Sequence, residues 1–445
     1  MAAPQDHIGD LMAELKAKKI EYVRFELPDL HGISRAKVVP IDKVEAFARQ
    51  GLNFYGGVLA FDTSSNVVPG AGLHAETNFA DQFLFPDPGT LRVLPWLPAT
   101  AALICTGYWG PDRPQRAAPR WVYGQLISEA NRMGYDVMMG HEFEYYLLAA
   151  DTKRRLFEGI HIFHGVRNQY TPFLDELVPR LRALGIDVIT HNCEYAGSQF
   201  ETNYGPAVNL AAADKAFTFK NAMKELAHRN GLIASFMAKP FAGLSGSGCH
   251  LHVSLWERAT GRNAFFDPAA EQGVSAVAQS FVEGILAHAP AMMPLINPTP
   301  NCYHRVKPHT FAPSNVSWGV EDRTALVRIK ASGDERTHIE MRAASATSNP
   351  YLTAATTLAA GLTGLKKGSR LRRQGRERPS EDDPALPKLP PSLEAALDAL
   401  EDDPEMRASL GEEFIKVFGT VKRFELARFR AHITDWETAE YLELY

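Results

Sequence analysis

Two glutamates stand two residues apart in the segment 140–147, GHEFEYYL. If this segment forms a β-strand, Glu142 and Glu144 share one face, because side chains alternate along a strand. Neighbouring carboxylates repel each other unless a positive group neutralises them, and in a cleft that group is usually a hard cation. The pattern therefore predicts a metal site. A solvent-facing edge strand, with its aromatic residues turned to the core, is the alternative.

Two more carboxylates, Glu194 and Glu201, lie on either side of a Gly-Ser pair at 197–198. This dipeptide is typical of a turn, so a hairpin folded here would bring the two glutamates together. The pair extends the hypothesis of a site that is rich in acidic ligands.

A Gly-Ser turn at 245–248 leads into the segment 249–256, CHLHVSLW. As a strand, this segment places His250, His252 and Ser254 on one face. The His-x-His spacing suits contacts to a metal or to phosphate, whereas a pair of exposed surface histidines is the alternative. The lysine and the following helix of a P-loop are missing, which excludes that phosphate-binding motif.

Four arginines follow on short apolar segments. Arginine is the preferred partner of carboxylate and phosphate, because its guanidinium donates two parallel hydrogen bonds. Glu340 lies two residues before the last of them, so these two side chains share a strand face. Carboxylates, histidines and arginines together predict a site for nucleotide phosphate, a cation and a carboxylate substrate. The arginines are Arg305, Arg323, Arg328 and Arg342.

Hydrophobic periodicity predicts the elements that would position these residues. Near the N-terminus, Ile8, Leu11, Met12 and Leu15 recur at helical spacing. Pro119 is expected to open a helix, after which helices alternate with strands. Strands are expected at 20–27, 35–39, 91–96, 101–106, 187–190 and 233–236, and helices at 171–184, kinked at Pro179, and at 210–229.

A chain of 445 residues is too long for one ordinary core, so two domains are expected, joined by a Pro-, Gly- and charge-rich linker at 110–119. With 45% hydrophobic and 22% charged residues, the composition is typical of a globular enzyme. A net charge of −5 speaks against nucleic acid as the main partner. The sequence shows neither a membrane-spanning run nor a secretory pattern, and its four cysteines are scattered, so a cytoplasmic location without membrane attachment is expected.

The order of these features resembles the glutamine synthetase family, in its type I-like branch, over essentially the whole chain. Each string is weak alone, but nine strings in the family's order are specific. They are YVRF (22–25) with DLHG (29–32), FDTSS (61–65), EFE (142–144), E with GSQFE (194–201), KP (239–240) before SGSGCHLH (245–252), DRTALVR (322–328), IEMR (339–342), NPYL (349–352) and LPPSLEAAL (389–397).

The resemblance implies an α+β fold. A small N-terminal β-grasp-like domain would span 1–110, and a large catalytic domain, with a curved antiparallel sheet flanked by helices, would span 111–445. It also implies ATP and two divalent cations, Mg²⁺ or Mn²⁺, at each site. Glu144, Glu194 and Glu201 match the ligands of one cation, and Glu142, His250 and Glu340 match those of the other, nearer the ATP phosphates.

The resemblance assigns roles to the remaining site residues. Asp62 matches the aspartate that binds and deprotonates ammonium, and it would serve a neighbouring subunit's site, because members form rings of six that commonly stack as a dodecamer. His252 and Ser254 match nucleotide contacts, and Arg323 and Arg328 match the arginines around the transferred phosphate. For the glutamate substrate, Arg305 matches the anchor of the α-carboxylate, Gly246 matches a contact to the amino group, and Arg342 matches a contact to the γ-carboxylate.

Three positions depart from the family's pattern. Six residues after Arg305, ammonia-using members carry a glutamate that makes the ammonium pocket anionic, whereas this chain has Phe311. An aromatic ring removes a charge and adds apolar surface, which favours an amine with a hydrocarbon part. The asparagine beside the substrate amino group is Ser245, and an arginine on the phosphate side is His338, which can titrate.

The sequence therefore predicts an ATP-dependent ligase that joins the γ-carboxylate of glutamate to an organic amine through γ-glutamyl phosphate, yielding ADP and phosphate. Three alternatives stay open: an ammonia-using glutamine synthetase, an inactive structural or amine-sensing relative, and a ligase or kinase of similar fold that acts on another carboxylate. The segment 378–389 has no tyrosine where adenylylated relatives carry one, so control by that modification is not expected.

Overall fold

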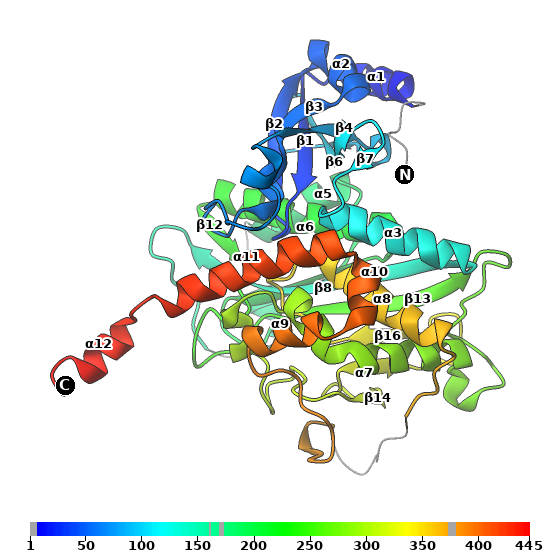
Figure 1. Ribbon diagram of the computed structural model, residues 1–445, viewed down its shortest axis with the longest axis vertical. Helices are drawn as coiled ribbons and strands as arrows, with labels where there is room; N and C mark the ends of the chain where they lie inside the picture. Colours follow the sequence, from blue (N-terminus) through cyan, green and yellow to red (C-terminus); the bar gives the residue numbers. More distant parts are fainter. Residues whose placement is uncertain (1–6, 160–161, 169–172, 373–379) are drawn as a thin grey trace.

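The computed structural model describes residues 7–159, 162–168, 173–372 and 380–445. These residues form a small lobe around the N-terminal strands and a larger lobe around a second sheet, as Figure 1 shows. Helix α11 (Glu412–Arg430) belongs to the large lobe and also contacts the small one, and α12 (Asp435–Tyr441) extends away from the body.

The small lobe is built on a 7-stranded sheet that is covered by α1 (Ile8–Ala17) and α2 (Ile41–Gln50). Its main strands, in the order β2-β1-β6-β4-β3, are β1 (Tyr22–Pro28), β2 (Ser34–Pro40), β3 (Leu52–Tyr55), β4 (Asp81–Pro86) and β6 (Thr100–Gly110), with β5 (Arg92–Val93) and β7 (Arg113–Pro114) paired to β6. Val23, Phe25 and Leu27 alternate along β1 and are buried, as expected for a strand with one face on the core.

The large lobe is built on a 9-stranded sheet of the described residues, with the order β14-β15-β16-β13-β8-β10-β9. Its pairs are antiparallel except for β14 with β15. The strands are β8 (Tyr135–Ala149), β9 (Val188–Cys193), β10 (Gln199–Tyr204), β13 (Cys249–Glu257), β14 (Trp318–Val320), β15 (Val327–Lys330) and β16 (His338–Met341), with β11 (Ala207–Val208) and β12 (Leu232–Ser235) paired to β8.

The central strand β8 has one buried and one open face. Its odd-numbered residues from 137 to 145 are buried, whereas Glu142 and Glu144 on the other face are half-buried. Phe143 stacks on Phe219 of α6 (Leu210–Arg229) with ring centroids 5.9 Å apart. The alternation therefore arises because the sheet packs on helices through one face only.

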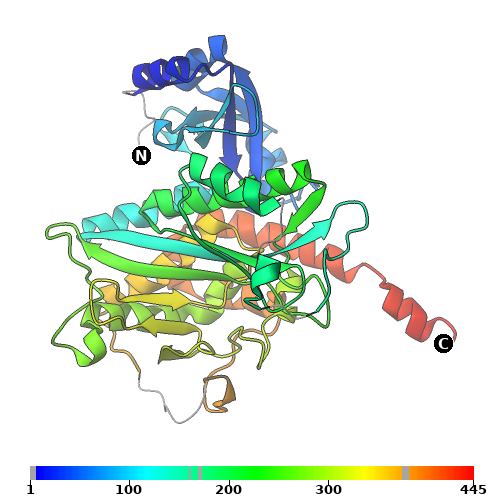
Figure 2. The same cartoon turned by 180° about the vertical axis from the view of Figure 1, so that it is seen from behind.

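Helices α3 (Pro119–Arg132), α6, α7 (Ala276–Ile296) and α8 (Pro350–Lys366) cover that buried face, and Figure 2 shows the strands in front of them. The remaining helices are α4 (Gly165–Asn168), α5 (Phe173–Ala183), α9 (Leu393–Glu401) and α10 (Pro404–Leu410). Helices α7 and α8 make the most extensive contact between helices, because Gly284 of α7 lies against Gly364 of α8. Among the described helices, none is both long and apolar enough to cross a membrane.

The predicted α+β class is confirmed, with a curved sheet flanked by helices. The helix at the N-terminus, the helix opened by Pro119 and the helix at 210–229 are confirmed, and so are the strands at 20–27, 35–39, 101–106, 187–190 and 233–236, within a few residues. The helix predicted at 171–184 corresponds to α5. Its predicted start, 171–172, lies outside the described residues, and Pro179 lies inside the helix.

One prediction along the small lobe needs correction. The strand expected at 91–96 is reduced to the two residues of β5, because the chain turns at Leu94, whose carbonyl accepts a hydrogen bond from the Leu97 N–H. In the predicted linker at 110–119, β7 pairs with β6 and Gln115 is fully buried, whereas residues 111–113 are exposed. The division into domains at residue 110 stays a prediction.

The close contact of α7 and α8 should make Gly284→Ala destabilising. An added Cβ would overlap the carbonyl oxygen of Ala360, and overpacking a core typically costs about 1–3 kcal/mol. Gly419→Ala in α11 is the matched control, because the nearest atom lies 4.0 Å from its Cβ position. Alanine there should raise the free energy of unfolding by about 0.5–1 kcal/mol. Denaturant unfolding of both variants measures the two changes in the free energy of unfolding, which should have opposite signs. Equal changes would contradict the close contact of α7 and α8.

Candidate active site

Strand register brings the predicted metal residues side by side on the open face of the large sheet. Residues directly opposite each other on antiparallel strands have Cβ atoms about 4.5–5.5 Å apart. The opposed pairs are Glu142 with His250, Glu144 with Glu201, and His252 with Glu340. The sheet therefore gathers carboxylates and imidazoles that are far apart in the sequence.

Two overlapping groups present ligand atoms within 4.8 Å of one another: Glu142, His252 and Glu340, and Glu142, Glu201 and His250. His250 Nδ1 lies 2.8 Å from Glu142 Oε1 and 3.6 Å from Glu340 Oε1. His252 Nε2 lies 3.4 Å from Glu142 Oε2, so both histidines lie beside Glu142, the carboxylate that the two groups share. Carboxylate oxygen and imidazole nitrogen suit Mg²⁺ and Mn²⁺. The residues fit divalent cations, and the assignment of each ligand stays a prediction.

The hairpin of β9 and β10 brings Glu194 near Glu201 and Glu144, and the Glu194 N–H donates to Gln199 O at 2.8 Å. Burial and the neighbouring Glu144 carboxylate raise the pKa of Glu194 to about 8. Burial and the carboxylates of Glu142 and Glu144 raise the pKa of Glu201 to about 10. Shifts of this direction mean that the negative charges at this end are poorly compensated by the chain. A cation would relieve them.

The other end of the site is compensated by the chain itself. Burial alone would raise the pKa of Glu142, but His250 and His252 outweigh it and lower the value well below the usual range. Burial also opposes ionisation of Glu340, whereas His250 and Arg342 lower its pKa to about 2. The site therefore pairs a charge-balanced end with an end where burial and repulsion between carboxylates dominate.

The predicted phosphate arginines differ in their surroundings. Arg328 donates to Glu340 Oε2 at 3.1 Å and also pairs with Glu321, while its buried Nε has no hydrogen-bond partner among the described residues. Such an unpaired donor fits a site that receives an anion such as phosphate. Arg342 pairs with Glu340, and its Nε donates to Arg323 O at 2.9 Å. The Arg323 side chain itself is exposed.

The Gly-Ser turn before β13 lies on Arg305. A Cβ at Gly246 would stand 2.8 Å from Arg305 Cγ and 2.7 Å from Ala238 O, so only glycine fits there. Arg305 is 5% exposed and donates to Ala343 O at 3.2 Å. The backbone carbonyl of Ser245 accepts from Tyr146 OH at 2.6 Å. This packing holds the predicted glutamate-binding residues beside Glu144.

A cavity of about 530 Å³ opens beside the charge-balanced end, and its volume is in the range of small-ligand sites. It is lined by the predicted nucleotide contacts His252 and Ser254, by Glu142 and by His338. Trp256 also lines it and donates to Ser254 Oγ at 3.0 Å. The structure thus places the predicted nucleotide residues around one cavity.

The chain matches the model of the glutamine synthetase catalytic domain over residues 116–441. It is 33% identical to a glutamine synthetase of Methanocaldococcus jannaschii over 445 residues, which cover 96% of each chain. Among solved structures, it is similar to "GmaS/ADP complex-Conformation 1", with a TM-score of 0.87, 30% identity and coverage of 98% of this chain and 99% of that one. A "novel glutamine synthase homolog" gives a TM-score of 0.82 at 27% identity, with coverage of 96% and 99%.

The chain belongs to the glutamine synthetase family. It is a carbon–nitrogen ligase that uses ATP, and the family requires divalent metals. Members of the glutamine synthetase family bind small-molecule substrates and are oligomeric. The clustered carboxylates and imidazoles on the open sheet face are consistent with that chemistry.

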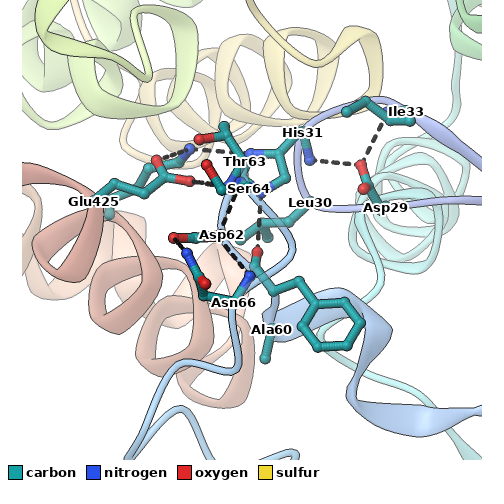
Figure 3. Close-up of polar contacts among 12 residues, drawn as sticks. Asp29, Leu30, His31, Ile33, Ala60, Asp62, Thr63, Ser64, Asn66 and Glu425 are labelled. Atoms are coloured by element: carbon teal, nitrogen blue, oxygen red, sulfur yellow. Dashed lines mark hydrogen bonds and ion pairs between the residues drawn. The ribbon is translucent and has the colours of Figure 1, made fainter. Parts of the chain in front are cut away.

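Asp62 lies in a loop of the small lobe, shown in Figure 3, and its hydrogen-bond partners come from that loop and from α11. Its Oδ1 accepts from the N–H groups of Ser64 and Asn66 at 2.9 and 2.8 Å, and its Oδ2 accepts from Asn66 Nδ2 at 2.9 Å and from Arg428 of α11. Burial would raise its pKa, but these hydrogen bonds outweigh it and lower the pKa. Asp62 is therefore an ionised, fully buried carboxylate that organises its own loop.

A second cluster ties the same loop to α11. Glu425 Oε1 accepts from the Thr63 N–H at 3.0 Å, and Lys422 donates to Glu425 Oε2 at 2.8 Å and to His31 Nδ1 at 3.2 Å (Figure 3). Burial, followed by the charge of Lys422, lowers the pKa of His31. Its other ring nitrogen then donates to Phe61 O at 3.0 Å. Helix α11 thus holds the loop that carries Asp62.

Sequence reasoning missed three carboxamides and two aromatic residues near the site, and it missed the arginine that pairs with Asp62. Gln199 and Asn203 flank Glu201 at a spacing of two, so strand alternation alone could have placed all three on one face. No comparable local signal points to Arg428, which reaches Asp62 from 366 residues away. The other missed residues are Asn192, Tyr204 and Trp256.

A divalent cation should stabilise the folded chain, because it neutralises buried carboxylates that repel each other. An ion that binds only the folded state adds about 2.7 kcal/mol to the free energy of unfolding at a hundredfold excess over its dissociation constant. Millimolar Mg²⁺ or Mn²⁺ should raise the thermal midpoint, and EDTA should reverse the rise. Glu201→Gln should lose most of the shift, whereas the exposed Glu271→Gln should keep it. Equal shifts in both variants would argue against a cation at Glu201.

Lys422→Met should strongly destabilise the chain, since it leaves the buried carboxylate of Glu425 without its cation. Breaking a buried ion pair from one side typically costs about 3–5 kcal/mol. Arg430→Ala is the matched control on the same helix, because its pair with Glu394 is exposed and should contribute little. Chemical unfolding of the two variants provides the measurement. A Lys422 variant as stable as the Arg430 variant would show that the buried cluster is not stabilising the loop.

Proposed function

We propose that this chain joins the γ-carboxylate of L-glutamate to an organic amine and so makes a γ-glutamylamide. The observation that carries the proposal is Phe311, at the position where ammonia-using relatives have a glutamate. Phe311 is 60% exposed, so its ring offers apolar surface instead of packing in the core. Similarity to a structure named GmaS, a γ-glutamylmethylamide synthetase, supports an amine larger than ammonia.

In this proposal the glutamate is held at three points. Arg305 binds the α-carboxylate, Gly246 with its neighbour Ser245 contacts the amino group, and Arg342 contacts the γ-carboxylate. The burial of Arg305 supports its role, because a guanidinium with few protein acceptors is a strong partner for a carboxylate. A guanidinium is planar and donates in a fixed fork, whereas a lysine ammonium is a flexible point charge. Arginine at this position therefore favours one fixed orientation of the substrate.

The reaction needs two displacements. A γ-carboxylate oxygen attacks the γ-phosphorus of ATP, and ADP leaves. The amine nitrogen then attacks the carbonyl carbon of γ-glutamyl phosphate, phosphate leaves, and the amine loses a proton. Divalent cations, when bound, neutralise the phosphoryl oxygens. Arg323 and Arg328 donate to the transferred phosphoryl group, while His252 and Ser254 orient the nucleotide.

An aliphatic amine is mostly protonated near neutral pH, as the reference lysine pKa of ~10.4 indicates, so a base must take its proton. We assign this role to Asp62, acting at the site of a neighbouring subunit in a dodecamer of two stacked rings. Arg428 must then move away from Asp62, and its 41% exposure leaves it room to do so. The separate N-terminal domain of residues 1–110 would deliver this loop to the neighbour.

Ammonia-dependent glutamine synthesis is the second candidate function. The Asp62 position and all six predicted metal residues are kept, and the relatives named glutamine synthetase support it. An inactive assembly protein is disfavoured, because inactive relatives usually lose metal ligands first and this chain keeps all six residues.

A panel of amines tests the choice, with glutamate and ATP present and phosphate release as the readout. Wild-type protein should prefer an organic amine to ammonia in kcat/KM. Phe311→Glu should shift this ratio towards ammonia by about tenfold, because a pocket contact of this kind is worth about 1–3 kcal/mol. Phe79→Glu is the matched control, since Phe79 is also exposed and has a similar positive φ, 54° against 55°.

Ammonia outperforming every organic amine in the wild-type protein would defeat the proposal in favour of glutamine synthesis. No phosphate release with any amine would support the inactive relative instead.

A further inference from the structure

Side-chain amides hydrogen-bond to Glu144, Glu194 and Glu201, the carboxylates at the hairpin end of the site. The three contacts are Asn192 Nδ2 to Glu194 Oε1 at 2.9 Å, Asn203 Nδ2 to Glu201 Oε1 at 2.9 Å, and Gln199 Nε2 to Glu144 Oε2 at 3.4 Å. The same Gln199 amide donates to Gly246 O at 3.0 Å, and Gly248 N donates to Glu144 Oε2 at 2.8 Å. Each carboxylate is therefore held through one named oxygen.

The strand pattern places these amides beside the carboxylates. Gln199, Glu201 and Asn203 occupy alternate positions of β10 and share its open face, while the residues between them are buried on the other face. Asn192 stands directly opposite Glu201 on β9. Along β10 the order is therefore amide, carboxylate, amide, and Asn192 of the neighbouring strand β9 adds a third amide.

The type of donor matters for a site that binds a cation. An amide NH₂ donates to a carboxylate and fixes its orientation without bringing a charge. Glu340, in contrast, is held by the guanidinium groups of Arg328 and Arg342, which lower the need for a cation there. Neutral donors therefore orient Glu144, Glu194 and Glu201 without adding a positive charge that would compete with a bound cation.

We propose that Asn192, Gln199 and Asn203 are positioning residues that orient these three carboxylates and set the affinity of their cation position. The inference rests on the proposed function, because it takes the carboxylates as ligands. Groups that hold metal ligands in place typically contribute 10–100-fold, or about 1.4–2.7 kcal/mol, to metal affinity. Gln199 also links the cation position to the Gly246 loop, so cation and glutamate binding are coupled through one amide.

The test is a titration of the full-length, nucleotide-free protein with Mn²⁺, followed by calorimetry and by the EPR signal of free Mn²⁺. Asn203→Leu keeps a similar volume and removes the donor to Glu201, so it should raise one Mn²⁺ dissociation constant about tenfold. Thr190→Val is the matched control, because Thr190 Oγ1 is the other acceptor of the Asn203 amide, at 3.1 Å. It should leave Mn²⁺ binding unchanged.

Asn192→Leu provides a second variant from another strand, with the same expected loss, in case Asn203→Leu does not fold. Unchanged Mn²⁺ affinity in folded leucine variants would overturn the inference while leaving the proposed function intact. Equal weakening by Thr190→Val would also overturn it, since the loss would then reflect general loosening of the hairpin. Wild-type protein that binds no Mn²⁺ would instead remove the proposed function itself.

Discussion

Repulsion among carboxylates that share one face of a sheet is the constraint on which this structure depends. Glu144, Glu194 and Glu201 are gathered where water is scarce, and burial with mutual repulsion raises the pKa values of the last two. Such an arrangement is unfavourable unless the surrounding fold holds it in place. The helices behind β8 provide that support, because the buried side of the same strand packs on α6 and its neighbours.

The carboxylates of the site are stabilised in two different ways. Glu340 and Glu142 are balanced by arginine and histidine side chains, so their negative charge persists at neutral pH without an ion. Among the described residues, the hairpin carboxylates Glu194 and Glu201 accept from amide and backbone donors, so they favour an added cation. This difference lies next to a cavity of about 530 Å³ and is consistent with the chemistry of an ATP-dependent ligase of the glutamine synthetase family.

The loop of Asp62 is held by a segment that lies far along the chain. Helix α11, close to the end of the chain, holds the loop through Arg428 and Glu425, which contact residues 62 and 63. Within one chain the Asp62 carboxylate is fully buried and engaged. An active site shared between subunits would therefore require a local rearrangement as well as a neighbour.

The sequence by itself determined which residues face together within one strand or hairpin, as with Glu142 and Glu144, and it identified the family through ordered motifs. These features are local, because strand alternation and turn preference act over a few residues. Only the tertiary structure decided that His250 stands opposite Glu142 and that Arg428 reaches Asp62. It also decided that amide side chains, and not arginine or lysine, hydrogen-bond to Glu201 and Glu194 among the described residues. Register and packing between distant segments set those contacts, since they depend on how the whole core closes and leave no periodic signal in the chain.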